Sequence, residues 1–189
     1  MLAESQLAST RNFTLVNMVG ILEAQLCAYV WIVGGHKPQM LNQSKYRVTL
    51  DASVLLQYES AVPRGHIVLE HFKNNDKINF QDFRKILAFF CGLDIGIDSS
   101  VLSAAKKRIV SAQKTRHIVV HTHSKAQAYE ITELRNIYEP RINEFLSPAA
   151  LADNRIHITD AFIKQLGEDI KLAFGEITRK SITYAHNHD

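Results

Sequence analysis

The sequence contains few residues of the types that cross-link or interrupt a chain: two cysteines, four prolines and eight glycines among 189 residues. Cys27 and Cys91 are far apart and lie in apolar segments, whereas a secreted disulfide scaffold shows several cysteines at short spacing. The two cysteines therefore indicate buried thiols in a reducing compartment. Residues 1–14 lack the basic region and the apolar core of a signal peptide.

A long uninterrupted hydrophobic run is also missing. The apolar stretch 19–33 contains Glu23 and Gln25, and it is too short to span a bilayer. Hydrophobic residues make up 46% of the chain and charged residues 22%, which is typical of a folded globular protein. We expect a soluble, cytoplasmic protein with no membrane partner.

Several glycine-rich functional motifs are absent. No P-loop, dinucleotide-binding or Gly-x-Ser-x-Gly pattern occurs, and the segment Gly92 to Gly96 is too short and too acidic to hold a phosphate. Nucleotide hydrolysis by a P-loop is therefore unsupported. The formal net charge of +3 is only mildly basic and neither requires nor excludes a nucleic-acid partner.

Most of the chain shows helical periodicity. Apolar residues recur at spacings of three and four in the first helix, before Gly34 and Gly35, at Leu15, Val19, Leu22, Leu26 and Val30. Further helices are predicted within 50–72, after Asn79 as the N-cap, after Ser99 or Ser100 as the N-cap, over 126–145 and from Thr159 to about Ser181. The last has Ile163, Leu166, Ile170, Phe174 and Ile177 in register.

These patterns predict one all-α domain over 1–189. Its expected form is a helical bundle with an up-and-down core and accessory helices, in which 126–182 supplies the C-terminal helices. Only Arg155 to Thr159 alternates as a short strand would, and no partner strands surround it. We therefore expect one isolated extended segment and no sheet.

The segment 116–121, Arg-His-Ile-Val-Val-His, places an arginine and a histidine five positions apart in an apolar helix. At about 100° per residue, Arg116 falls on the apolar face, with Leu102, Ala105, Ile109, Ala112 and Val120. A guanidinium there needs a carboxylate partner, an interface or a cleft. His121 lies about 140° away, on a basic face shared with Lys107, Lys114 and His117.

This segment resembles the Arg-x4-6-His motif of the HEPN superfamily (higher eukaryotes and prokaryotes nucleotide-binding domain), in which a polar residue commonly follows the arginine. His117 occupies that position. The preceding Phe80-Gln81-Asp82-Phe83-Arg84-Lys85-Ile86-Leu87 and Phe90-Cys91-Gly92-Leu93-Asp94-Ile95 also resemble HEPN proteins of prokaryotic defence and toxin systems. The similarity is best over about 76–125 and weaker toward the C-terminus, through Ile156-His157-Ile158-Thr159.

The resemblance implies a metal-independent endoribonuclease that uses no cofactor. Attack by the ribose 2′-hydroxyl would leave a 2′,3′-cyclic phosphate and a 5′-hydroxyl. His121 would transfer protons and Arg116 would stabilise the phosphoryl oxygens, because imidazole titrates near neutrality and guanidinium binds phosphate in a bidentate manner. His117 would support this pair, and Lys107 and Lys114 are candidates for contacts with the RNA backbone.

The resemblance also implies a homodimer, in which two copies of the motif form one composite cleft. It implies an effector in a toxin-antitoxin or anti-phage defence system, with an antitoxin or other regulatory partner protein. On a straight helix Arg116 and His121 point about 140° apart. In the composite cleft they could still act together, because residues of one chain would complement those of the other. One departure from the pattern is that Thr122, His123 and Ser124 stand where the turn after the motif would carry glycine or asparagine.

Other interpretations remain open. A zinc site at His117 and His121 lacks the glutamate of a His-Glu-x-x-His motif and lacks nearby cysteine or acidic ligands. A non-catalytic helical module would dimerise through the apolar face around Arg116 and bind a nucleotide, RNA or a partner protein, as some members of the superfamily do. A protein that binds RNA without cleaving it is a third interpretation.

Overall fold

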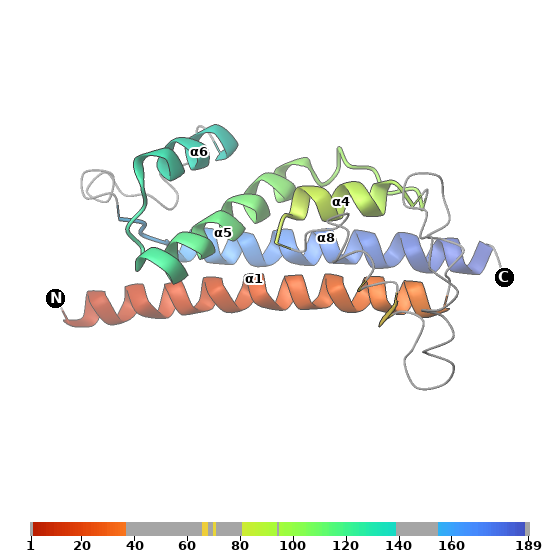
Figure 1. Ribbon diagram of the computed structural model, residues 1–189, viewed down its shortest axis with the longest axis horizontal. Coiled ribbons are helices and arrows are strands. Elements are labelled where there is room, and N and C mark those ends of the chain that lie inside the picture. The colour runs from red at the N-terminus through yellow and green to blue at the C-terminus, as the bar shows by residue number, and fades with distance from the viewer. Residues whose placement is uncertain are drawn as a thin grey trace. The chain divides into compact units, whose positions relative to one another are not determined.

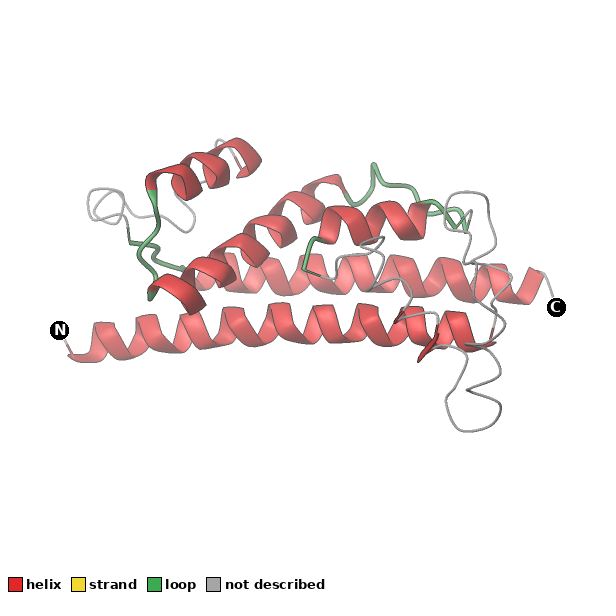
Figure 2. Cartoon of the chain, in the orientation of Figure 1, coloured by secondary structure: helices red, strands yellow, loops and turns green. Residues whose placement is uncertain are grey.

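The computed structural model describes residues 2–36, 66–67, 70, 81–93, 95–138 and 155–187. This part of the chain forms five helices, in the order α1 (Leu2–His36), α4 (Phe83–Cys91), α5 (Ser103–Thr122), α6 (Ala128–Tyr138) and α8 (Asp160–Asn187) (Figure 1). Helices and short loops account for the described residues, which contain no strand (Figure 2). The predicted all-α fold class is confirmed there. Most of the predicted helical unit at 50–72 lies outside them.

Internal contacts divide the chain into two compact units. The first comprises Met1–Leu22 and Ser100–Ala173, and the second comprises Glu23–Ser99 and Phe174–Asp189. Helices α1 and α8 each contribute residues to both units. The first unit positions the candidate site, because it contains all five predicted site residues of α5: Lys107, Lys114, Arg116, His117 and His121.

The apolar stripe of α1 is buried as the periodicity predicts. Its five members, which recur every three or four residues, are at most 1% exposed: Leu15, Val19, Leu22, Leu26 and Val30. The helix nevertheless begins much earlier than the stripe, at Leu2, and continues through Gly34 and Gly35 to His36. Glycine lowers helix stability without forbidding the conformation, and α1 ends one residue after the two glycines, at the stop that the sequence predicted.

Helix α1 is the one described helix that is long and apolar enough to cross a membrane. The span Glu4–Ile32 has 29 residues and contains a window of mean hydropathy 1.5, so it is longer than the stretch 19–33 considered on the sequence. A mostly buried core helix of a water-soluble protein and an N-terminal signal sequence meet the same criterion, and 28% of this window is buried. The absence of a membrane partner stays a prediction.

Two of the helix starts differ from the sequence predictions. Helix α4 begins after Asp82, whose carboxylate accepts a 3.0 Å hydrogen bond from the backbone N–H of Arg84; the predicted cap, Asn79, lies outside the described residues. Helix α5 begins after Leu102 and has no side-chain cap, so Ser99 and Ser100 lie in the preceding turn. Each correction shortens the predicted helix at its first turn.

The first residues of α6 and α8 carry recognisable caps. The carboxylate of Glu130 accepts a 2.7 Å hydrogen bond from the backbone N–H of Gln127, which is half of a capping box. The hydroxyl of Thr159 accepts a 3.1 Å bond from the N–H of Phe162, so α8 begins where the sequence predicted. Residues 139–154, which include the predicted end of the helix over 126–145, lie outside the described residues.

The second unit contains an aromatic cluster. The ring of Tyr29 packs edge-on against Phe90 and Phe174, with centroid separations of 5.5 and 6.3 Å. Phe89 and Phe90 are adjacent on α4, and both are fully buried. Burial raises the pKa of the Tyr29 phenol, although its hydrogen bond with Ser181 lowers that pKa in part. These aromatic residues give the second unit its own core.

Candidate functional site on helix α5

Helix α5 is buried on all sides through its middle, from Arg108 to Gln113, and has exposed residues toward both ends. The residues predicted for its apolar face are buried at four of five positions, namely Leu102, Ala105, Ile109 and Ala112. Val120 is 49% exposed, contrary to that prediction. Arg116 is half-buried, and the buried residues on either side of it are Thr115 and Ile118. The predicted apolar face is therefore buried through Ala112, and beyond that residue the buried face contains Thr115 and Ile118 instead.

The arginine that does occupy the core face of α5 is Arg108. Its side chain is 6% exposed and donates a hydrogen bond to the carboxylate of Asp169 on α8, which is 7% exposed. An ionised pair that leaves water needs such a partner, because an unpaired buried charge is very costly. A buried arginine–carboxylate pair of the kind considered for Arg116 is thus formed by Arg108, which the sequence alone places in a basic cluster of the same helix.

Asp169 could have been found from spacing. The buried positions of α8 in this unit follow one another at three and four residues, and Asp169 interrupts an otherwise apolar series: Phe162, Leu166, Asp169 and Ala173. Of the face predicted for α8, Leu166 and Ile177 are buried, whereas Ile163, Ile170 and Phe174 are only half-buried. This difference arises because large apolar side chains stand next to the buried positions of α8 and give a similar helical spacing.

His117 and His121 are both exposed and lie next to each other. Their ring centroids are 4.5 Å apart and their planes are inclined by 46°, as expected for residues one helical turn apart. The sequence placed them on one face with Lys107 and Lys114; Lys107 is exposed and Lys114 is half-buried. The structure therefore brings the two histidines together on the accessible side of α5.

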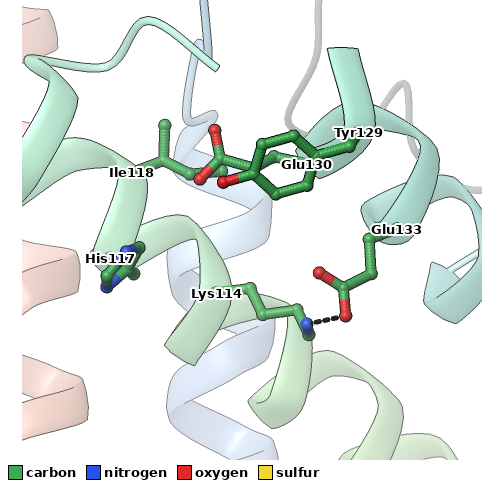
Figure 3. Close-up of a pocket in the computed structure, with 6 residues that line it drawn as sticks. All are labelled: Lys114, His117, Ile118, Tyr129, Glu130 and Glu133. Atoms are coloured by element: carbon green, nitrogen blue, oxygen red, sulfur yellow. Dashed lines mark ion pairs between the residues drawn. The ribbon is translucent and has the colours of Figure 1, made fainter. Parts of the chain in front are cut away.

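Lys114 is occupied by a neighbouring carboxylate. It forms an ion pair with Glu133 of α6 (Figure 3), and both side chains line a cavity of about 240 Å³ with His117, Ile118, Tyr129 and Glu130. The labelled residues of Figure 3 come from α5 and α6. With one lysine against two glutamates, this cavity has a negative formal balance.

The turn after α5 contains two consecutive residues in the left-handed region. His123, the C-cap, has φ 52° and Ser124 has φ 70°, a conformation that glycine or asparagine adopts more readily. At these positions the sequence departs from the HEPN motif that it resembles. The hydroxyl of Ser124 accepts a 3.0 Å hydrogen bond from the side chain of Asn12, and its carbonyl accepts a 2.9 Å bond from the N–H of Ile156.

A second, larger cleft of about 690 Å³ adjoins this turn. It is lined by residues from the start of α1, from the turn and from the segment 155–157. In that segment Ile156 and Ile158 are buried while Arg155 and His157 are exposed, which confirms the predicted alternation. Its only ladder contact within the described residues is an antiparallel bridge between Lys125 and Arg155. Neither Arg155 nor His157 was predicted to be a site residue.

An ion pair fixes one wall of the second cleft. The guanidinium of Arg11 donates two hydrogen bonds of 2.7 and 2.6 Å to the carboxylate of Asp160, the first residue of α8. These bonds hold the pKa of Asp160 below its ordinary value. A carboxylate at a helix N-terminus is also favoured by the helix dipole. Arg11 is consequently neutralised, although it lines the cleft.

The described ranges contain no group of three His, Cys, Asp or Glu side chains that could hold a metal ion. His117 and His121 could supply two nitrogen ligands, but a tetrahedral site takes four.

Comparison with known proteins finds no matching family model, no matching curated protein and no matching solved structure. The site must therefore be interpreted from its own geometry and from the resemblance in its motif.

Proposed function

We propose that this protein is a metal-independent endoribonuclease of the HEPN type, acting as a homodimer. The observation that carries the proposal is the exposed pair of His117 and His121, with Arg116 adjacent on α5. Imidazoles that reach solvent can exchange protons with a polymeric substrate, and a nearby guanidinium can bind the phosphate that reacts.

The reaction needs one proton removed and one supplied. A base takes the proton of the ribose 2′-hydroxyl, the freed oxygen attacks the adjacent phosphorus, and the bond to the 5′-oxygen breaks as that oxygen receives a proton. His121 lies in the last turn of α5 and is exposed to solvent. That position suits it to donate a proton to the leaving oxygen, with the partner chain's motif completing the cleft.

Arg116 would stabilise charge on the phosphoryl oxygens, and His117 would orient His121. In a biological setting the cleavage activity implies an antitoxin or another regulatory partner, since an uncontrolled ribonuclease damages its host. Lys107 is exposed and would contact the RNA backbone, whereas Lys114 would do so by exchanging its ion pair with Glu133 for a phosphate.

The test is cleavage of a labelled pool of transfer and messenger RNA in EDTA. We expect wild type to produce cyclic-phosphate ends, and Arg116→Ala and His121→Ala proteins to leave the RNA intact while keeping their fold and oligomeric state. Loss of dimerisation in Arg116→Ala would instead indicate a structural role. Intact RNA with wild type, over a range of RNAs, would contradict the ribonuclease proposal.

A second candidate is a helical module that binds a partner protein without catalysis. It is favoured by the cavity of Figure 3, whose carboxylates Glu130 and Glu133 repel a polyanion and whose Tyr129 side chain is 70% exposed. Exposed aromatic residues of this kind are common in protein interfaces. Retained partner binding by His121→Ala, with no RNA product from wild type, would support this alternative.

A further inference from the structure

The two cavities of the first unit differ in charge. The cavity of Figure 3 contains Glu130, Glu133 and Lys114, whereas the larger cleft contains Arg11, Arg155, His123, His157 and a single carboxylate, Glu4. Asp160 neutralises Arg11 from outside the lining. With Arg11 paired, the formal charges of Arg155 and Glu4 balance, and Arg155 and the two imidazoles are groups of the lining that can donate hydrogen bonds to an anion.

A second observation places unbalanced positive charge at the same position. Lys125 and Arg155 are opposite each other in an antiparallel bridge, and both side chains are exposed. Directly opposed residues project to the same side of the paired backbone, where like charges destabilise the pairing. No carboxylate of the described residues pairs with either one in the structure. A bound anion would offset this repulsion.

The backbone around the cleft is held in place against its intrinsic preference. His123 and Ser124 remain in the left-handed region because Asn12 and Ile156 bind the two oxygens of Ser124. This arrangement fixes the backbone of His123, which lines the cleft. Strained backbone persists where surrounding contacts over-determine it, and such positions concentrate at ligand sites.

We propose that this cleft binds a backbone phosphate of the RNA strand, next to the site of cleavage, through Arg155, His157 and His123. The inference rests on the proposed function, and it names the substrate-binding surface of the same site. His123 follows His121 by two residues, so a strand whose scissile phosphate is at the end of α5 needs little length to reach the cleft. Leu7, Ala8 and Ile156 also line the cleft and offer apolar surface to a ribose or base.

Binding is tested apart from cleavage with a short fluorescein-labelled 2′-O-methyl RNA, which lacks the attacking hydroxyl. Each phosphate contact on a single strand contributes about 0.7 to the slope of log affinity against log salt. We expect Arg155→Gln to weaken binding about tenfold and to lower that slope by about 0.7. Lys125→Gln should weaken binding by less.

The matched control is Lys164→Gln, which removes one exposed positive charge from α8 in the same unit and should bind like wild type. Equal weakening by Arg155→Gln and Lys164→Gln, or none by Arg155→Gln, would overturn the inference. Circular dichroism of each variant verifies its fold. Because Arg155 is exposed, its truncation leaves no buried cavity.

Inorganic phosphate serves as a competitor that separates a free anion from a strand. If phosphate displaced the RNA at the same concentration of phosphate groups as unlabelled oligomer, the cleft would be a small-anion site and the commitment to RNA would be wrong. If Arg155→Gln weakened RNA binding but wild type cleaved no RNA, the proposed phosphate site would be supported and the ribonuclease proposal contradicted. If wild type cleaved RNA but Arg155→Gln bound it unchanged, the ribonuclease proposal would be supported and the phosphate site contradicted.

Discussion

His117 and His121 lie one turn apart on α5 with their ring centroids separated by 4.5 Å. Both rings are exposed, so this contact is not a by-product of core packing. It gives His121 a neighbour that restricts its rotamers, which is the role that a supporting residue would have. The contact also means that a substitution at either position affects the other.

The contact predicts unequal losses of activity. We expect His121→Ala to reduce the rate of RNA cleavage about a hundredfold or more, as for loss of a general acid or base. His117→Ala should reduce it about tenfold, because the proton-transfer group remains but loses its neighbour. Rates are measured on labelled RNA in EDTA, with His186→Ala, an exposed histidine of α8, as the control. Equal losses at 117 and 121 would assign both histidines to proton transfer.

The buried pair of Arg108 and Asp169 predicts a large and recoverable loss of stability. Arg108→Met leaves Asp169 without its main cation, and we expect the free energy of unfolding to fall by about 3 kcal/mol. Combining it with Asp169→Leu should restore most of this loss, since two apolar side chains can replace a buried ion pair. Urea denaturation of wild type, both single variants and the double variant measures the coupling. If the double variant lost as much stability as the two single variants together, the predicted coupling between Arg108 and Asp169 would be contradicted.

The N-cap of α4 predicts a dependence of stability on pH. Partial burial raises the pKa of Asp82, but hydrogen bonds from Arg84 outweigh it and the pKa is lowered overall. A carboxylate with a depressed pKa in the folded state stabilises the protein above its unfolded pKa, near 4, and this contribution is lost as pH falls through the folded value.

We therefore expect Asp82→Ala to lower the free energy of unfolding by about 1 kcal/mol at neutral pH. The difference from wild type should shrink as the pH falls below about 4. Asp82→Asn should retain most of the stability at neutral pH, because an amide oxygen can also cap the helix. Denaturation midpoints measured from acidic to neutral pH test this. If the difference in stability between wild type and Asp82→Ala did not change with pH, the charge of Asp82 would contribute nothing to the free energy of unfolding.

The left-handed conformation of His123 predicts opposite effects of two substitutions. Glycine adopts φ 52° without strain, whereas a β-branched residue is strongly disfavoured there. We expect His123→Gly to leave stability unchanged or slightly increased, and His123→Val to be less stable than His123→Gly by about 2 kcal/mol. Thermal unfolding of both variants provides the comparison. If the two were equally stable, the turn would have rearranged and the conformation would not be fixed by its neighbours.

Periodicity predicted much of the fold because core faces repeat every three or four residues. It identified the stripe of α1 around Leu22 and the buried start of α5 around Ile109. It failed at helix ends, as in the displacement of the α4 cap to Asp82, because more than one polar residue near a helix start, here Asn79 and Asp82, can cap the helix. Only the three-dimensional contacts choose among them.

The candidate site was predicted in part for similar reasons. Helical geometry on its own places His117 beside His121, so the sequence could anticipate that contact. It could not anticipate that Glu133 pairs with Lys114 or that Arg155 reaches a cleft beside His123, since these residues come from separate segments. Likewise the choice of Arg108 over Arg116 as the buried arginine depends on where Asp169 lies on another helix.

The pairing of Arg108 with Asp169 also limits the paths by which this sequence can change over evolutionary time. Either residue altered alone leaves a buried charge without its main counterpart, so the intermediate with one substitution is the least stable member of the series. We expect the two positions to vary together among natural descendants of this chain, both charged or both apolar. Random mutagenesis followed by selection for folding should therefore recover double changes at these positions and few single ones.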